Sequence, residues 1–212
     1  MATKKKEKAI PEVKDINVQL KINTITVPIV SVAPLIMSRF DTKTQQQIIE
    51  SGPGKAKQGK KKMDTPEEQY ERSIYRFADS DDIGMPAVSF KSAMVRAAQV
   101  VYEKQMVRTR TLFHVLPEGF DDQGNGLIKL NGKPRMRTDM VRIGTMTKTA
   151  SPRYRAEVPQ WDAKLTIQYV DGQISEEEIV SYINAAGFCC GVGEWRPEKS
   201  ASGSFGLFRV AS

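Results

Sequence analysis

The chain has 212 residues, of which 40% are hydrophobic and 27% are charged, a composition typical of a folded globular protein. These values exclude a collagen, a wholly disordered chain and a disulfide scaffold, and no stretch reaches the ~18 consecutive apolar residues that a membrane-spanning helix requires. The 32 Lys and Arg residues outnumber the 25 Asp and Glu residues, giving a net charge of +7. A net positive charge favours anionic partners, of which nucleic acid is the commonest.

The N-terminal segment and the cysteines carry information on cellular location. Residues 1–15 are Lys-rich and interrupted by Pro11, which is typical of a flexible basic tail and unlike a signal peptide. The two cysteines, Cys189 and Cys190, are adjacent, so a disulfide between them is disfavoured and a reducing compartment is favoured. We therefore expect a cytoplasmic protein without a membrane partner. We also expect residues 16–212, after the tail, to form a single domain.

The first part of this domain contains a strand pattern and a lysine-rich insertion. Residues 17–34 are β-branched and alternating, and the change of parity near Asn23 predicts a bulge or bend in the strand. A short helix is expected over 42–50. Residues 51–63 contain five Lys, three Gly and no acidic residue, which predicts a mobile basic insertion. Its lysines could clamp a bound nucleic-acid strand, and an inert linker is an equal alternative.

Two helices follow, and the first has the signature of a capped N-terminus. Thr65 is the expected cap, Pro66 suits the first helical position and Glu68 completes a capping box. Its expected apolar face consists of Tyr70, Ile74 and Phe77. The second helix is expected to begin at a Ser89 cap and to bury Phe90, Met94, Ala97, Ala98 and Val101.

Residues 107–160 are rich in basic side chains. A strand is predicted over 107–116, and residues 127–143 have the pattern of a hairpin with Asn131-Gly132 at its turn. Arg135 and Arg137 would share one face of this hairpin and could track a phosphate backbone, the alternative being a solvated surface hairpin. Between positions 129 and 155 only Asp139 is acidic, against eight basic residues: Lys129, Lys133, Arg135, Arg137, Arg142, Lys148, Arg153 and Arg155.

The C-terminal part completes the order of elements. Trp161–Val170 alternates as an amphipathic strand, and the helix that follows is capped by Ser175 and Glu178 and ends at Gly187. A glycine-punctuated stretch leads into a last strand over 207–211. The order strand, helix, two strands, helix, strand predicts an α+β fold with a ferredoxin-like (RRM-like) β-α-β-β-α-β core, insertions, and a glycine-rich loop before the last strand.

The glycine-rich stretch resembles a known family. Gly191–Arg196 (GVGEWR) and Gly203–Arg209 (GSFGLFR) are similar to the glycine-rich loop of the RAMP superfamily, the RNA-binding subunits of CRISPR effector complexes. Met85–Arg96 is similar to the family's segment entering its first helix. The resemblance implies a ferredoxin-like fold and, as in the backbone-type members, assembly of copies along RNA. Departures at 88–89 and 194–195 indicate a diverged relative, for which a viral origin is one alternative.

Candidate nucleic-acid contacts follow from the loop, the basic stretch and the resemblance together. Glycines allow the loop amides to approach a phosphate, and Arg196 and Lys199 add charge. Trp195 or Phe205 could stack on a base, the alternative being a tight connection with both rings in the core. The predicted contacts are Lys60, Lys61, Lys62, Lys91, Arg96, Lys133, Arg135, Arg137, Arg142, Arg153, Arg155, Gly191, Gly193, Arg196, Lys199, Gly203 and Gly206.

Catalysis has a weaker basis in the sequence. RAMP endoribonucleases often use a histidine as general acid or base, but the single histidine, His114, has no evident catalytic partner, so a core or surface histidine is favoured. One His and two neighbouring Cys cannot complete a zinc shell, and the acidic groups at 79–82 and 121–122 are typical of turns. We predict no catalytic residue, no metal and no cofactor.

These patterns favour a non-enzymatic protein that binds single-stranded RNA or DNA and self-assembles along the strand. The glycine-rich loop and the basic hairpin are expected to grip the phosphates. Two alternatives stay open: a viral structural or assembly protein whose basic face contacts other proteins, and, less favoured, a metal-independent endoribonuclease. A viral protein would be located in the host cytoplasm.

Overall fold

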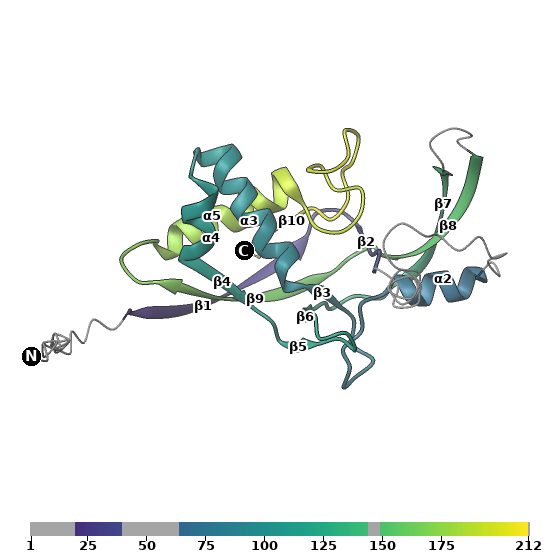
Figure 1. Cartoon of the computed structure of the whole chain (residues 1–212), viewed down its shortest axis with the longest axis horizontal. Coiled ribbons are helices and arrows are strands. Elements are labelled where there is room, and N and C mark those ends of the chain that lie inside the picture. The colour runs from purple at the N-terminus through teal and green to yellow at the C-terminus, as the bar shows by residue number, and fades with distance from the viewer. Residues whose placement is uncertain (1–19, 40–63, 144–148, 212) are drawn as a thin grey trace, which may run out of the picture.

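The computed structural model describes residues 20–39, 64–143 and 149–211, with the side chains at 142, 143 and 149 excepted (Figure 1). The predicted tail at 1–15, the short helix at 42–50 and the insertion at 51–63 lie outside these residues. So do Lys60, Lys61, Lys62, Lys148 and the side chain of Arg142.

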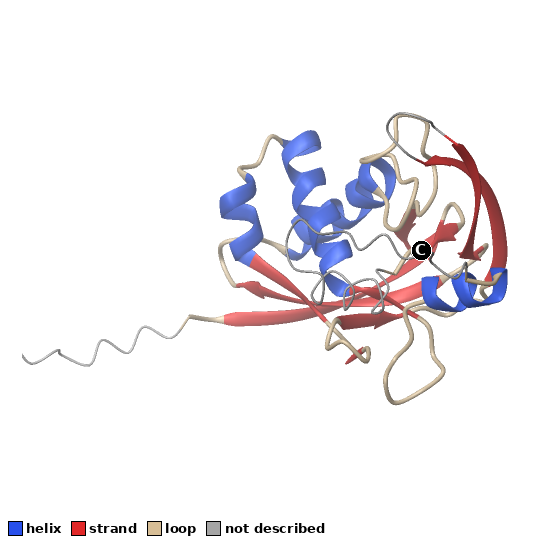
Figure 2. Cartoon of the chain, turned by 45° about the vertical axis from the view of Figure 1, so that its right-hand side comes forward, coloured by secondary structure: helices blue, strands red, loops and turns tan. Residues whose placement is uncertain are grey.

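A four-stranded antiparallel sheet and two helices form the centre of the fold. They are β1 (Ile22–Ser31), α3 (Ala87–Tyr102), β4 (Phe113–Leu116), β9 (Asp162–Val170), α5 (Glu176–Ala185) and β10 (Phe208–Val210). The strand order is β10-β1-β9-β4, and both helices lie on one face of the sheet (Figures 1 and 2). Because α3 precedes β4 and α5 connects β9 to β10, this is the order of a ferredoxin-like β-α-β-β-α-β core. The predicted α+β fold class is confirmed.

The core lies between this sheet and the two helices. The alternation predicted for the strand after Gln160 is confirmed, because Trp161, Ala163, Leu165, Ile167 and Tyr169 are all buried. On α3, four of the five expected apolar residues are buried, but Val101 is 45% exposed. The helix also begins earlier than predicted. Its N-cap is Pro86, the last residue of β3 (Gly84–Pro86), so Ser89 lies inside the first turn and does not cap the helix.

The first strand is unbroken, and the bulge predicted near Asn23 is wrong. β1 pairs with β9 in one continuous register from Ile22 opposite Val170 to Val30 opposite Asp162. The parity of the sequence pattern changes because Leu20 and Ile22 are exposed, at 66% and 54%, and not because the backbone shifts. Val27 and Ile29 supply the buried apolar side chains of this strand.

The region at 107–160 differs most from expectation. The strand predicted over 107–116 is only half right: residues 107–112 belong to a helix, α4 (Met106–Leu112), and only 113–116 form a strand, β4, into which this helix runs directly. The hairpin predicted at Asn131-Gly132 is wrong, because Asn131 forms a bridge with Asp162 and so joins the central sheet to the strands around it. The strands before and after Asn131 belong to different sheets. One holds β3, β5 (Gly119–Phe120) and β6 (Gly126–Lys129); the other holds β2 (Leu35–Ile36), β7 (Arg135–Ile143) and β8 (Thr149–Val158).

Both predicted capping boxes are present. Thr65 and Glu68 cap α2 (Pro66–Ser73), although this helix ends before Phe77, and Ser175 and Glu178 cap α5. The chain does not leave the helical path at Gly187, because a π-helical turn, η1 (Ala186–Cys190), continues α5 to Gly191. Gly187 is needed for packing on the last strand, since a Cβ there would lie 1.9 Å from the Phe208 carbonyl oxygen.

The two cysteines are free, in agreement with the expectation that they form no disulfide. Burial raises the pKa of the Cys190 thiol to about 11, so this side chain is protonated near neutral pH. Among the described helices, none is long and apolar enough to cross a membrane.

Candidate nucleic-acid interface

The hairpin of β7 and β8 carries its charges on one face. Cross-strand register places Arg135 opposite Glu157, Arg137 opposite Arg155, and Asp139 opposite Arg153. Residues two apart on a strand point to the same side, so four arginines and two carboxylates share this face. The prediction that Arg135 and Arg137 lie on one face of a hairpin is therefore confirmed, although their partner strand is β8.

Both carboxylates are buried and hold arginines. Glu157 accepts hydrogen bonds from Arg135 Nε at 2.7 Å and from an Arg137 terminal nitrogen at 2.8 Å. Asp139 accepts from Arg137 Nε at 2.9 Å and from Arg155 at 2.9 Å. The pKa of Arg137 is raised: burial lowers it, but the hydrogen bonds to Glu157 and Asp139 outweigh burial. Glu157 lies just beyond the basic stretch, which is why counting charges within that stretch overstated the free positive charge.

The glycine-rich loop, residues 191–207, packs on this charged face through its two aromatic rings. The Arg155 guanidinium carbon lies 4.8 Å from the centre of the Trp195 ring, and that of Arg137 lies 4.8 Å from the Phe205 ring. Contacts of this geometry are favourable cation–π interactions. Trp195 is part-buried under these guanidinium groups, so it is neither a core residue nor a freely exposed stacking platform.

The glycines of the loop allow close contacts with the protein's own backbone. Gly206 has φ +66° and Gly193 has φ +80°, and a Cβ would lie 1.7 Å from the Val192 carbonyl oxygen and 2.5 Å from that of Ile36, respectively. Several loop amides are already used, since Gly206 N donates to Pro34 O at 2.7 Å and Glu194 N donates to Ile36 O at 2.9 Å. The loop is therefore a fixed connection, and its phosphate contacts stay a prediction.

The remaining predicted cations differ in whether a protein group already holds them. Arg196 is bonded to Glu198 and to the Gly193 carbonyl oxygen, and Arg96 donates to Gln99 at 2.6 Å. Lys133, Arg153 and Lys199 are exposed, and within the described residues none of them forms an ion pair. Arg135 is bonded to Glu157 but keeps 65% of its side chain exposed. These four side chains, which we call the exposed hairpin–loop cations, are exposed enough to meet a phosphate.

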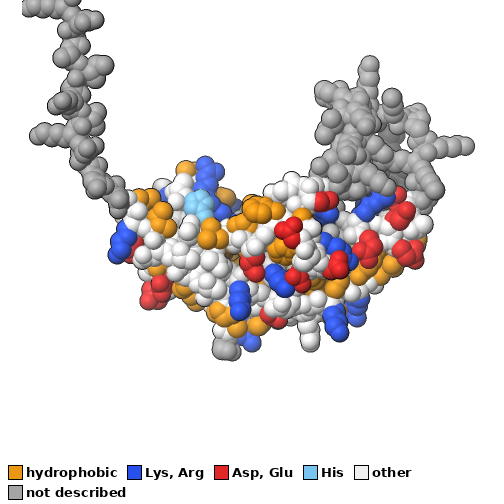
Figure 3. Space-filling model, turned by 90° about the horizontal axis from the view of Figure 1, so that it is seen from below, with side chains coloured by type: hydrophobic (Ala, Val, Ile, Leu, Met, Phe, Trp, Pro, Cys, Tyr) orange, Lys and Arg blue, Asp and Glu red, His pale blue; other side chains and the backbone are white. Residues whose placement is uncertain are grey.

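Lys91 lies elsewhere, at the β4 edge of the central sheet, where its Nζ is 3.0 Å from His114 Nδ1. The face of this sheet opposite the helices is shown in Figure 3. Sequence reasoning missed two exposed cations on it, Lys164 on β9 and Arg209 on β10. The alternation of each strand was the signal, because both residues fall between buried or part-buried neighbours.

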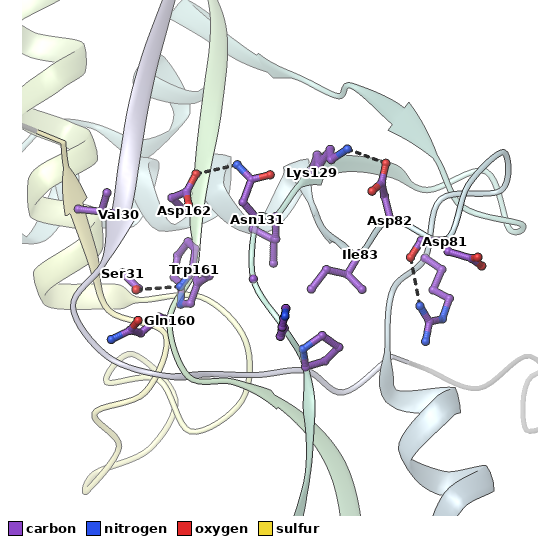
Figure 4. A pocket seen from close by; sticks show the side chains of 15 residues that line it. Val30, Ser31, Asp81, Asp82, Ile83, Lys129, Asn131, Gln160, Trp161 and Asp162 are labelled. Atoms are coloured by element: carbon purple, nitrogen blue, oxygen red, sulfur yellow. Dashed lines mark hydrogen bonds and ion pairs between the residues drawn. The ribbon is translucent and has the colours of Figure 1, made fainter.

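A cavity of 910 Å³ lies between the central sheet and the small sheet of β3, β5 and β6 (Figure 4). Two polar contacts lie in its wall: Lys129 Nζ forms an ion pair with Asp82 at 2.7 Å, and the uncharged Asn131 amide donates to Asp162 at 2.7 Å. Lys133 lines the same cavity. The acidic residues at 79–82 form a turn, as predicted.

The second acidic group, at 121–122, is also part of a turn. Asp121 is buried, accepts hydrogen bonds from the backbone of Gln123 and Asn125, and forms an ion pair with Arg39. Within the described residues there is no group of three or more His, Cys, Asp and Glu side chains able to hold a metal ion.

Comparison with known proteins places the fold. No protein-family model matches the chain, and no curated protein matches it. A chain of the type III-B Cmr-beta complex bound to cognate target RNA, solved by cryo-electron microscopy, is similar with a TM-score of 0.50 and 14% identity. The match covers 91% of this chain and 60% of that one, so this chain spans less than two thirds of its neighbour's length. Cmr6 from Pyrococcus furiosus matches with a TM-score of 0.42 and 10% identity over 91% of this chain and 100% of Cmr6. The strand order and the Cmr-beta likeness show that the chain has a RAMP-like ferredoxin-type α+β fold.

Proposed function

We propose that the chain binds a single strand of nucleic acid through its phosphates, without catalysis, and that copies assemble side by side along the strand. The observation that carries this proposal is the set of exposed hairpin–loop cations, Lys133, Arg135, Arg153 and Lys199, beside a network in which the carboxylates are already used. The likeness in fold to a chain of an RNA-bound complex makes RNA the first ligand to test.

The buried network has a positioning role in this proposal. Arg137 and Arg155 tie the hairpin to the glycine-rich loop through Asp139, Glu157 and the two aromatic rings. A rigid junction presents the exposed cations without a further ordering cost on binding. Cations that meet phosphates carry no sequence information, so we expect weak sequence preference.

We propose self-assembly because four exposed cations can meet only a few phosphates and because several apolar side chains are exposed. Phe188 is 80% exposed, Val88 70% and Met140 68%, and such side chains favour contact with another protein surface. A neighbouring copy on the same strand adds contacts to one ligand, which couples binding to association. We propose that residues 16–212 act as one domain in this assembly.

The experiment compares variants by fluorescence anisotropy with a labelled single-stranded RNA of mixed sequence. Arg153→Ala and Lys133→Ala each remove an exposed cation, and each should weaken binding. If one phosphate contact is lost, the slope of the logarithm of the association constant against the logarithm of salt concentration should become shallower by about 0.7. Lys104→Ala is the matched control, because Lys104 is paired with Glu178 at 3.2 Å near the end of α3. Equal affinities for wild type, Arg153→Ala and Lys133→Ala would contradict the proposed interface.

A parallel experiment tests the absence of catalysis. His114→Ala should leave the affinity for a hydroxyl-ended strand unchanged, and wild-type protein should leave labelled RNA intact on a denaturing gel with or without divalent metal. Metal-independent cleavage that His114→Ala abolishes would favour the endoribonuclease alternative. The single-stranded DNA of the same sequence, run beside the RNA, decides which nucleic acid binds more tightly.

A further inference from the structure

Two nitrogen-bearing side chains meet at the β4 edge of the central sheet, and a third, on the preceding helix, is close enough for its charge to act on one of them. Lys91 comes from α3, Arg110 from α4 and His114 from β4. Arg110 lies in the last turn of α4, four residues before His114, and α4 runs directly into β4. Lys91 Nζ lies 3.0 Å from His114 Nδ1. In Figure 3 the chain's one histidine is at the surface beside Lys and Arg side chains.

This cluster differs from the hairpin network in lacking a carboxylate partner among the described residues. In the part of the chain that the structure describes, no carboxylate forms an ion pair with Lys91, Arg110 or His114. The pKa of Lys91 is lowered, first by partial burial and then by the positive charge of Arg110. Folding therefore holds Lys91 near a second positive charge that disfavours its own, a situation that a bound anion relieves.

The free hydrogen-bonding groups of the cluster are donors, and this also favours an anionic ligand. A lysine ammonium group only donates, so His114 Nδ1 is the acceptor in this contact and the N–H of the imidazole is on Nε2. The groups left to meet a ligand are this Nε2–H, the other ammonium hydrogens of Lys91 and the guanidinium of Arg110. All of them are donors, which suits a ligand made of acceptor oxygens.

We propose that Lys91, Arg110 and His114 form a binding site for a phosphomonoester dianion, separate from the exposed hairpin–loop cations. A phosphate monoester carries a charge of about −1.5 to −2 near neutral pH, which matches the two cations, whereas a diester within a strand carries one negative charge. Such a ligand is either the terminal phosphate of a nucleic-acid strand or a small phosphorylated compound. The site does not depend on the proposed strand binding, because inorganic phosphate alone is a sufficient probe.

The first experiment uses the single histidine as a reporter. In untagged protein the ring nitrogen and carbon resonances of His114 are the only histidine signals, and inorganic phosphate should shift them saturably. Lys91→Met, which keeps the apolar stem, and Arg110→Gln should each weaken phosphate binding by roughly tenfold, the loss of one charge-assisted hydrogen bond. Arg108→Gln, on the same exposed helix, is the matched control and should bind as the wild type does. Unshifted resonances, or equal losses in Arg108→Gln and Arg110→Gln, would overturn the site.

The second experiment identifies the source of the phosphate. Oligonucleotides of one sequence with a 5′-phosphate, a 3′-phosphate or hydroxyl ends are compared for binding to wild type and Arg110→Gln. Tighter binding of one phosphorylated form, lost in Arg110→Gln, identifies that strand end as the ligand. Equal binding of all three, with phosphate and adenosine monophosphate still shifting His114, identifies a small compound. Failure of strand binding with phosphate binding retained would refute the proposed function and leave this site standing.

Discussion

Replacing Gly206 by Ala tests the conclusion that the loop glycines serve internal packing. The residue has φ +66°, and a Cβ added to it would lie 1.7 Å from the Val192 carbonyl oxygen. Gly206 N also donates to Pro34 O at 2.7 Å, and its carbonyl accepts from Val192 N at 3.0 Å. A methyl group at this position must therefore push the Val192 carbonyl away and disturb both hydrogen bonds.

The expected cost is the sum of two effects. A left-handed alanine costs roughly 1–2 kcal/mol, and two disturbed backbone hydrogen bonds cost about 1 kcal/mol each. Gly206→Ala should thus lower the free energy of unfolding by about 3–4 kcal/mol, or about 10 °C in Tm for a chain of this length. Gly172→Ala is the matched control, since Gly172 has φ +71° but nothing within 4 Å of an added Cβ. It should lose only about 1–2 kcal/mol.

The assay is urea unfolding followed by circular dichroism, with thermal unfolding as a second readout. The slope of free energy against urea should be the same in both variants, because each changes stability without changing the surface exposed on unfolding. A loss in Gly206→Ala no greater than that in Gly172→Ala would refute the reasoning, since the left-handed backbone conformation that the two positions share would then account for the whole effect.

Three further predictions concern the buried network, an acidic turn and the lysine-rich insertion. In a double-mutant cycle, Arg155→Met and Asp139→Asn should show a coupling of about 1–3 kcal/mol in unfolding free energy, whereas additive losses would mean that the 2.9 Å contact contributes nothing. The pKa of Asp121 is lowered although burial opposes this, because hydrogen bonds from Asn125 and Gln123 and the charge of Arg39 outweigh burial. The ionised Asp121 carboxylate therefore stabilises the folded state above the unfolded pKa of about 3.9, and this stabilisation is lost as pH falls through the lower folded pKa. Asp121→Asn should accordingly be less stable than wild type at neutral pH, and its stability should approach that of wild type in acid. A gap between the two that is constant with pH would contradict this. Deleting residues 53–62, which lie outside the described residues, should weaken strand binding and reduce the strand-induced increase in light scattering, while Tm stays unchanged. A deletion variant that binds the strand and scatters light as wild type does would show that the insertion is an inert linker.

Patterns among neighbouring residues in the sequence were enough to predict the fold class. The capping boxes at Thr65 and Ser175 depend on residues three apart, and the strand alternation after Trp161 depends on residues two apart. Both patterns are set by neighbouring residues, so they are readable without the tertiary structure. The position of the glycine-rich loop between the second core helix and the last strand followed from the order of these elements.

The pairings that define the site could not be predicted in the same way. Asn131-Gly132 has the sequence of a tight turn, but its backbone bonds to Asp162 decide its structure, and that partner is distant in the sequence. Arg137 bonds Glu157, twenty residues away, and Lys91 reaches His114, twenty-three residues away. Charge counting along the chain reports which residues are basic, but only the tertiary structure shows which of them already have a carboxylate.

The salt dependence of strand binding tests the central claim most directly. Affinity of the wild-type chain for a single-stranded RNA is measured by anisotropy over a series of salt concentrations, and the logarithm of the association constant is plotted against that of the salt concentration. If the four exposed hairpin–loop cations each neutralise one phosphate, the slope should be about −3, at about −0.7 per phosphate on a single strand. An affinity that does not change with salt would contradict the claim that this protein binds nucleic acid through its phosphates.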